Sequence, residues 1–277
     1  MRLISVRLSD GQTSAAVMTP DGARLIDSAD VGKLLGEGEF AELVSRAMES
    51  GEKINLDQVQ MLPVVPDPKK ILCCGLNYRA HVREMNREEP EFPTLFAKFA
   101  DTLAGPNDDV VLPGYATDVD WEAELAVVVG ANLFQADVSE ARRGIAGYTV
   151  ANDISVRSWQ RRTLQWLQGK AFDATTPLGP VMVTPDEFDP ASGASITCTV
   201  DGRVVQTGTT DDLVFDPAEL LSYISQFTKL APGDLVLTGT PGGVGAGAVP
   251  PTFLADGSVV EVEISGIGKI SNTVRLG

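Results

Sequence analysis

One segment, residues 118–130, constrains the possible fold of this chain more than any other. Acidic and apolar residues alternate at its start, and the unbroken apolar run Leu125–Val129 follows. Alternation with period two is typical of a β-strand, whose successive side chains point to opposite faces. The pattern therefore predicts a strand that carries Glu122 and Glu124 on one face and enters the interior directly afterwards.

Two residues along a strand span about 6.6–6.8 Å of backbone, so flexible carboxylates at this spacing can converge on one ion. Buried like charges either raise a carboxyl pKa or hold a cation. The alternative is the solvated face of an edge strand that also carries Asp118 and Asp120, because charged side chains are mostly exposed. The segment alone leaves both interpretations open.

Histidine and cysteine limit the kinds of site that this chain can build. The sequence contains one histidine, His81, and three cysteines, Cys73, Cys74 and Cys198, without a C-x-x-C pair. A metal site must then be dominated by oxygen ligands, which favours Mg²⁺, Mn²⁺ or Ca²⁺. The chain has no G-x-S-x-G motif, and its odd number of cysteines argues against a disulfide framework and suits a reducing compartment.

The net charge of −16 would repel a phosphate backbone, which argues against nucleic acid and anionic membranes as partners. No apolar run reaches the roughly 18 residues of a membrane span. The first seven residues alternate like a strand and lack the apolar core of a signal peptide. A cytoplasmic location is therefore expected.

Two domains are expected. Short strands at the start precede one helix, which runs from Asp30 as its N-cap to about Met48. Three prolines within Leu62–Pro68 cannot propagate a helix or a central strand, so this segment predicts a boundary. The prediction is a small N-terminal domain of residues 1–66 and a large domain of residues 67–277.

The large domain alternates strands with glycine-containing turns. Its expected elements are strands at 70–76, 147–153, 195–200, 203–206, 235–238, 258–264 and 269–274, helices at 136–143 and 215–227, and turns at 105–109 and 177–180. Strands outnumber helices, and no regular βα alternation is present. The pattern predicts an α+β fold, mostly β, with an antiparallel or mixed sheet.

His81 and Glu84 lie three residues apart in a predicted helix and are therefore neighbours on one face. A carboxylate beside an imidazole raises the basicity of the ring, as a general base requires. The alternative is an ordinary surface pair. Asp153 stands at the end of a predicted strand, a position from which side chains commonly enter a site.

Arg157 and Gln160 follow at helical spacing, and an ordinary polar helix face explains them equally well. Lys170 lies in a predicted loop, where most lysines are exposed. The glycine-rich segment Gly239–Gly245 lacks the lysine of a phosphate-binding loop. Its backbone amides and Thr240 are better suited to a substrate carboxylate, although a purely conformational turn explains the segment at comparable odds.

Five separated segments occur in one order: Gly75–Glu84, Asp120–Val128, Asn152–Arg157, Gly169–Asp173 and Gly239–Gly245. Together they resemble the fumarylacetoacetate hydrolase superfamily, in particular its shorter acylpyruvase, oxaloacetate decarboxylase and hydroxyhepta-diene-dioate isomerase members. The resemblance extends from about residue 70 to 277. It implies a rolled mixed β-sandwich or barrel of the C-terminal type found in this superfamily, a small N-terminal α+β unit and a homodimer.

The resemblance implies Mg²⁺ or Mn²⁺ held by Glu122, Glu124 and Asp153. The founding hydrolases carry a further metal-binding aspartate seven residues before the histidine, where this chain has Cys74. This departure argues against fumarylacetoacetate as the substrate.

The resemblance also implies a catalytic His81–Glu84 dyad on a mobile lid around residues 81–92. Lys170 is expected to stabilise developing negative charge as a third catalytic residue. The expected substrate-binding residues are Arg157, Gln160 and Thr240.

These features predict a metal-dependent enzyme that acts on a small 2-oxo or 2,4-dioxo carboxylate. The first expectation is hydrolysis of a C–C bond in an acylpyruvate-like compound, with a water molecule activated by His81. The alternatives are decarboxylation of an oxaloacetate-like acid and isomerisation or hydration of a 2-hydroxy-diene-dioate. A catalytically silent metal- or ligand-binding domain is the non-enzymatic alternative.

Overall fold

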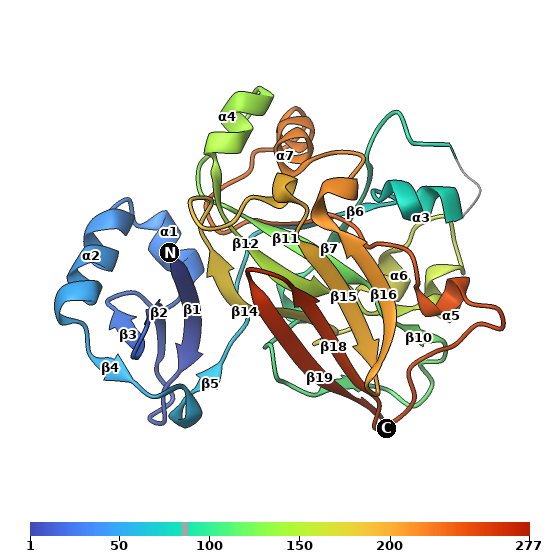
Figure 1. Ribbon diagram of the computed structural model, residues 1–277, viewed down its shortest axis with the longest axis horizontal. Coiled ribbons are helices and arrows are strands. Elements are labelled where there is room, and N and C mark those ends of the chain that lie inside the picture. Colours follow the sequence, from blue (N-terminus) through green and yellow to red (C-terminus); the bar gives the residue numbers. More distant parts are fainter. Residues whose placement is uncertain (85–87) are drawn as a thin grey trace.

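A computed structural model describes residues 1–84 and 88–277 of the chain. Two β-sheets pack face to face, and helices lie around their ends (Figure 1). Strands β14, β12 and β11 of the larger sheet face β19, β18 and β15 of the smaller one. The core between the sheets includes the buried side chains of Val127, Val150, Ile196 and Val262. This arrangement confirms the predicted α+β, mostly β fold.

The larger sheet follows the order β4-β3-β2-β1-β14-β12-β11-β17-β6-β7, with β5 beside β1 and β8 beside β14. It is mixed, because β17 pairs in parallel with β6, whereas β11 pairs antiparallel with both β12 and β17. Its strands are β1 (Arg2–Arg7), β2 (Thr13–Thr19), β3 (Gly22–Ile26), β4 (Lys53–Ile54), β5 (Gln60–Met61), β6 (Ile71–Gly75), β7 (Thr94–Lys98), β8 (Leu103–Ala104), β11 (Ala123–Val129), β12 (Ile145–Asn152), β14 (Thr176–Val183) and β17 (Leu235–Leu237).

The smaller sheet follows the order β16-β15-β18-β19-β9, and a short ladder joins β10 to β13. Asp201 and Gly202 both have positive φ, as the two-residue hairpin between the predicted strands β15 and β16 requires. The strands are β9 (Val110–Leu112), β10 (Val119–Asp120), β13 (Ser155–Val156), β15 (Ser195–Val200), β16 (Arg203–Thr209), β18 (Val259–Ile264) and β19 (Gly268–Leu276).

The helices are short, and two of them begin with reciprocal capping. Asp137 and Asp216 each accept a hydrogen bond from the backbone of a glutamate three residues later, and that glutamate's side chain accepts one in return. The α-helices are α1 (Val31–Gly36), α2 (Phe40–Ser50), α3 (Arg79–Glu84), α4 (Val138–Arg143), α5 (Arg157–Gln160), α6 (Leu167–Lys170) and α7 (Pro217–Ser225). No helix among the described residues is long and apolar enough to cross a membrane.

Strand β11 lies inside the larger sheet, and the edge-strand alternative is therefore wrong. Its seven residues are all buried, because the smaller sheet covers one face and α1 and the N-terminal strands belong to the core on the other. The predicted strand is interrupted, however. Trp121 and Glu122 lie outside any strand, at the point where the chain leaves β10 and enters β11.

Two further expectations were wrong. The single helix predicted from Asp30 to Met48 is two helices, because Gly38 adopts a positive φ of 74° that ends helical propagation. Asp30 does cap the first of them. The turn predicted at residues 177–180 is part of β14, which accommodates its prolines where the register with β12 shifts.

The predicted boundary segment, residues 62–68, contains neither helix nor strand. Strand β1 nevertheless pairs with β14, so the larger sheet continues across both predicted domains. The division into residues 1–66 and 67–277 stays a prediction, as do the homodimer and the cytoplasmic location. Residues 85–87, in the predicted lid, lie outside the described residues.

Because β11 is buried, removing an apolar side chain from it should cause a large loss of stability. Replacing the fully buried Leu125 by alanine should lower the free energy of unfolding by about 3 kcal/mol, through lost burial and a residual cavity. Urea denaturation measures this. Val111→Ala, at a 59% exposed position of β9, is the control and should change stability by less than about 0.5 kcal/mol. Equal effects of the two substitutions would contradict the central position of β11.

Candidate active site

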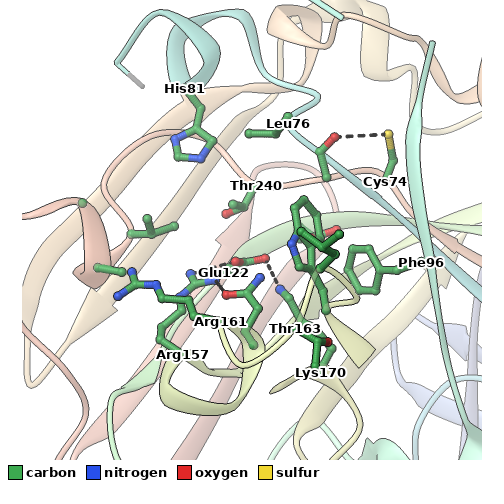
Figure 2. Close-up of a pocket in the computed structure, with 18 residues that line it drawn as sticks. Cys74, Leu76, His81, Phe96, Glu122, Arg157, Arg161, Thr163, Lys170 and Thr240 are labelled. Carbon is green, nitrogen blue, oxygen red and sulfur yellow. Dashed lines mark hydrogen bonds and ion pairs between the residues drawn. The ribbon is translucent and has the colours of Figure 1, made fainter. Parts of the chain in front are cut away.

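A cavity of about 450 Å³ opens beside the start of β11. Its walls come from α3, from α5 and the segment that follows it, and from the glycine-rich segment after β17 (Figure 2). The structure brings most of the predicted site residues to this cavity. Those that line it are His81, Glu122, Glu124, Arg157, Gln160, Lys170 and Thr240. The other two, Glu84 and Asp153, contact members of this set.

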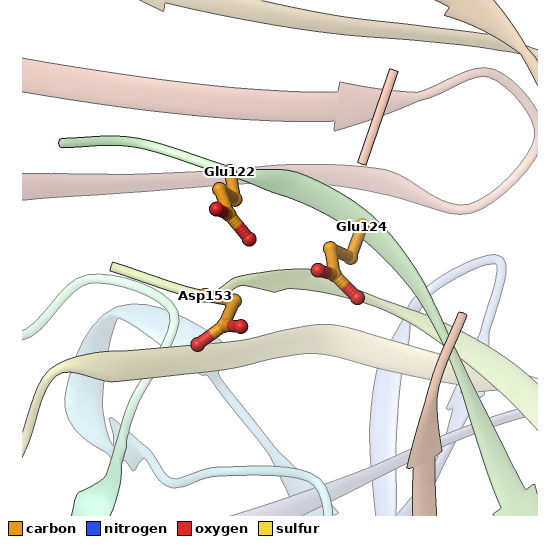
Figure 3. A group of neighbouring side chains, drawn as sticks. All are labelled: Glu122, Glu124 and Asp153. Atoms are coloured by element: carbon orange, nitrogen blue, oxygen red, sulfur yellow. The ribbon is translucent and has the colours of Figure 1, made fainter. Parts of the chain in front are cut away.

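Three carboxylates converge at the floor of the cavity. Oxygen atoms of Glu122, Glu124 and Asp153 lie within 4.8 Å of one another, and Figure 3 shows the three side chains as close neighbours. Strand pairing explains the convergence. Ala123 pairs with Asn152, so the residues just outside this pair, Glu122 and Asp153, meet, and the Asp153 N–H donates to the Glu122 carbonyl at 2.9 Å.

Two buried lysines neutralise part of this charge. The Lys170 Nζ lies 2.6 Å from Glu122 Oε2 and 2.7 Å from Asp153 Oδ2. The Lys98 Nζ lies 2.6 Å from Asp153 Oδ1. Lys170 is only 1% exposed, so the interpretation of an exposed loop lysine is wrong: the residue ends α6 inside the protein.

The carboxyl pKa values within the cluster diverge. Burial opposes ionisation of Asp153, but Lys170 and Lys98 outweigh it and lower the pKa of that carboxyl below its ordinary value. Burial raises the pKa of Glu124 well above its ordinary value, and the charges of Asp153 and Glu122 raise it further. Glu124 is therefore the member of the cluster whose negative charge is least compensated.

The donor set suits a hard divalent cation. Glu124 Oε2 accepts a hydrogen bond from the Gly239 N–H at 2.7 Å, and no ion pair joins Glu124 to a lysine or arginine in the described part of the chain. Of the four buried carboxyl groups here, Asp120, Glu122 and Asp153 form ion pairs with Lys98, Arg157 or Lys170, which leaves Glu124 as the one without a cationic partner among the described residues. Carboxylate oxygens that converge without full compensation are the ligands that Mg²⁺ and Mn²⁺ prefer.

Arg157 connects the acidic cluster to the glycine-rich segment. Its Nε donates to Asp120 Oδ2 at 2.8 Å, its Nη2 lies 2.7 Å from Glu122 Oε1, and its Nη1 donates to Gln160 Oε1 at 2.9 Å. Asp120 also accepts from the N–H groups of Gly245 and Ala246 at 2.7 and 3.0 Å. This network sets the position of Glu122 relative to the opposite wall of the cavity.

His81 lies on α3, across the cavity from the acidic cluster (Figure 2). Its Nδ1 lies 3.0 Å from Glu84 Oε2, as the predicted dyad requires. When Nδ1 carries the proton and donates it to this carboxylate, Nε2 keeps its lone pair and is free to act as a base. Thr240 lines the cavity as well, held by the Gln206 Nε2 that donates to its hydroxyl at 2.8 Å.

Sequence reasoning missed three residues that hold the site together. Lys98 was detectable as a lone lysine in the apolar stretch Leu95–Phe99, where a buried ammonium requires a carboxylate partner. Asp120 was noticed only as one of the acids in the alternating segment. Gln206, on the strand opposite Thr240, gave no signal, because its contacts cross between distant parts of the chain.

Known proteins resemble this chain along most of its length. Residues 70–275 match the fumarylacetoacetate (FAA) hydrolase C-terminal family. The human mitochondrial oxaloacetate tautomerase FAHD2A is 45% identical over 246 residues, which cover 87% of this chain and 78% of the human protein.

Solved structures extend the resemblance to the whole chain. Fumarylacetoacetate hydrolase from Exiguobacterium antarcticum has a TM-score of 0.89 at 29% identity, with 100% of each chain covered. 2-Hydroxyhepta-2,4-diene-1,7-dioate isomerase from Mycobacterium marinum has a TM-score of 0.81 at 31% identity, with 100% of this chain and 98% of that chain covered.

The raised pKa of Glu124 predicts a gain in stability when its charge is removed from metal-free protein. A group whose pKa is raised on folding stabilises the protein at low pH and loses that contribution as the pH rises through the folded value. Glu124→Gln should therefore raise the thermal midpoint at pH 8 in the presence of a chelator. The gain should shrink as the pH falls through the raised pKa of Glu124, because the wild-type carboxyl then takes up its proton.

The same variant should respond less to added metal. At a Mn²⁺ concentration 100 times the dissociation constant, binding stabilises the wild-type protein by about 2.7 kcal/mol. Glu124→Gln should lose most of this stabilisation, whereas Glu84→Gln, outside the acidic cluster, should keep it. Thermal scans with and without Mn²⁺ make the comparison. Equal metal-induced shifts in all three proteins would rule out Glu124 as a ligand.

Proposed function

This chain belongs to the fumarylacetoacetate hydrolase family, and we propose that it interconverts the enol and keto forms of a 2-oxo dicarboxylate of the oxaloacetate class. The tautomerase and isomerase relatives favour an isomerisation of this kind over the C–C hydrolysis that the sequence placed first. The observation that carries the proposal is the position of a His81–Glu84 pair opposite a buried acidic cluster, with one small cavity between them.

Glu122, Glu124 and Asp153 would hold the divalent ion, Mg²⁺ or Mn²⁺, which would supply a Lewis acid that stabilises negative charge developing on the substrate. Contacts within the protein fix two of these carboxylates without the ion. Arg157 and Lys170 hold the two oxygens of Glu122, and Lys98 and Lys170 hold the two oxygens of Asp153. Fixed ligands limit the reorganisation that binding requires.

His81 is suited to move the proton at C3. In the enol-forming direction, Nε2 takes a proton from C3, the C3–H electron pair becomes the C2=C3 double bond, and the carbonyl pair moves to O2, which is then protonated from solvent. Glu84 stabilises the positive imidazole that results, through its 3.0 Å contact with Nδ1. The reverse sequence returns the proton from Nε2 to C3 and gives the keto acid.

Lys170 supports the same charge shift. Two of its three N–H groups are directed at Glu122 and Asp153, and its ammonium lies 5.3 Å from the centre of the Phe96 ring. The remaining N–H is available for O2 as negative charge develops there. Burial excludes competing water, which strengthens this interaction relative to one in solvent.

Removing the base should abolish most of the activity but should not prevent metal binding. His81→Ala should lower kcat for ketonisation of enol-oxaloacetate by about 10²–10⁴-fold, because general acid–base catalysis contributes factors of this size. The decrease in enol absorbance with time measures the rate of the reaction. The Mn²⁺-induced rise in the thermal midpoint should be retained.

The products distinguish the proposed reaction from its alternatives. NMR of the reaction with wild-type protein should show keto-oxaloacetate without release of pyruvate above the spontaneous rate. Enzyme-dependent pyruvate would indicate decarboxylation, and cleavage of an acylpyruvate with comparable efficiency would restore the hydrolytic expectation. Turnover that is unaffected by His81→Ala would contradict the mechanism.

Glu84→Gln tests the second member of the dyad. The amide still reaches Nδ1 but no longer stabilises a positive imidazole, so kcat should fall by about tenfold while KM changes little. Steady-state kinetics on enol-oxaloacetate measure both constants. An unchanged kcat would mean that the pair is an ordinary surface contact.

A further inference from the structure

Three strongly basic side chains line the cavity: Arg157, Arg161 and Lys170. Two of them already form ion pairs with buried carboxylates of the protein. All three guanidinium nitrogens of Arg157 contact Asp120, Glu122 or Gln160, and Lys170 contacts two carboxylates at 2.6 and 2.7 Å. Arg157 therefore has little capacity for a substrate carboxylate, and its contacts assign it to positioning Glu122 and Gln160 instead.

Arg161 differs from the other two. It directly follows α5, and its backbone N–H donates to the Arg157 carbonyl at 3.2 Å. The residue is exposed, and no hydrogen bond or ion pair joins its guanidinium to a side chain in residues 1–84 and 88–277. Its neighbours at the rim include Thr163 and the 97% exposed Leu164. The Arg161 guanidinium thus belongs to a residue that lines a cavity with an acidic floor, and it has no side-chain partner among the described residues (Figure 2).

We propose that Arg161 binds the distal carboxylate of the substrate and makes the site selective for dicarboxylates. This proposal rests on the proposed function, which places the 2-oxo carboxylate end at the acidic floor. The distal carboxylate then lies toward the rim, and the other two basic groups of the cavity wall are already paired. A guanidinium is the side chain best matched to a carboxylate, because it donates two parallel hydrogen bonds.

Charge supports the same assignment. The three cations of the floor, Lys98, Arg157 and Lys170, already contact buried carboxylates, so none of them is left for a second substrate carboxylate. A bound divalent ion offsets the first carboxylate. The second still requires a cation at the rim, and Arg161 is the lining residue that provides one without breaking an existing ion pair.

The chain offers a matched control in the next residue. Arg162 carries the same charge, but its guanidinium stacks on the Trp159 ring at 3.7 Å and it does not line the cavity. A general effect of positive charge near the opening would involve both arginines. A specific subsite involves only Arg161.

Kinetics of the holoenzyme test the subsite in turnover. Arg161→Gln should raise KM for enol-oxaloacetate about 10- to 100-fold, the factor that corresponds to a lost hydrogen bond to a charged group. Its kcat should stay within about threefold of wild type, and Arg161→Lys should recover part of the lost affinity. Arg162→Gln should leave both constants unchanged. Equal KM values for wild type and Arg161→Gln would overturn the proposal.

Binding tests the subsite without turnover. Calorimetry on Mn²⁺-loaded protein compares malate with 2-hydroxybutanoate, which has a methyl group in place of the distal carboxylate. Wild-type protein should prefer malate at least tenfold, and Arg161→Gln should bind both acids equally. Equal binding by wild type, or an unchanged preference in Arg161→Gln, would overturn the subsite. If wild-type protein lacked tautomerase activity but still preferred malate, and Arg161→Gln removed that preference, the subsite would be supported and the proposed function refuted.

Discussion

The balance of buried charge at the start of β11 is the constraint on which the rest of this structure depends. Burying a carboxylate without a partner costs much free energy, because the charge loses its hydration. Three cations compensate for it here, each from a different element: Lys98, Arg157 and Lys170. Glu124 has no such ion pair among the described residues, and its pKa is raised by burial and by its acidic neighbours. Converging carboxylates of this kind are suited to a hard divalent cation.

The fold delivers these groups from distant parts of the chain to one end of the larger sheet. The pairing of β11 with β12 brings Glu122 beside Asp153, and α6 and β7 contribute the two lysines. Asp120 ties the glycine-rich segment to Arg157, while the dyad on α3 closes the opposite side. The acidic floor and the dyad thus face each other across one cavity, which is the arrangement on which the proposed function rests.

The local pattern of the sequence predicted much of this arrangement. Alternation predicted the strand at Glu124, spacing predicted the His81–Glu84 contact, and the helix expected at residues 215–227 contains α7. The failures have physical causes that lie beyond local pattern. The sequence around Lys170 is typical of an exposed lysine, because its partners Glu122 and Asp153 are distant in the chain. The segment Pro177–Pro180 is typical of a turn, because its pairing with β12 is not visible in the local sequence. Lys98 and Gln206 act only through long-range contacts, which no short window of sequence contains.

The central claim is that Glu122, Glu124 and Asp153 share one divalent cation. A crystal structure of protein grown with Mn²⁺, with anomalous scattering recorded at the manganese edge, tests it most directly. The account predicts one strong anomalous peak per chain, bonded to an oxygen of each of the three carboxylates at about 2.1–2.2 Å. No peak at this position, or a peak held by other residues while Lys170 still bridges Glu122 and Asp153, would contradict it.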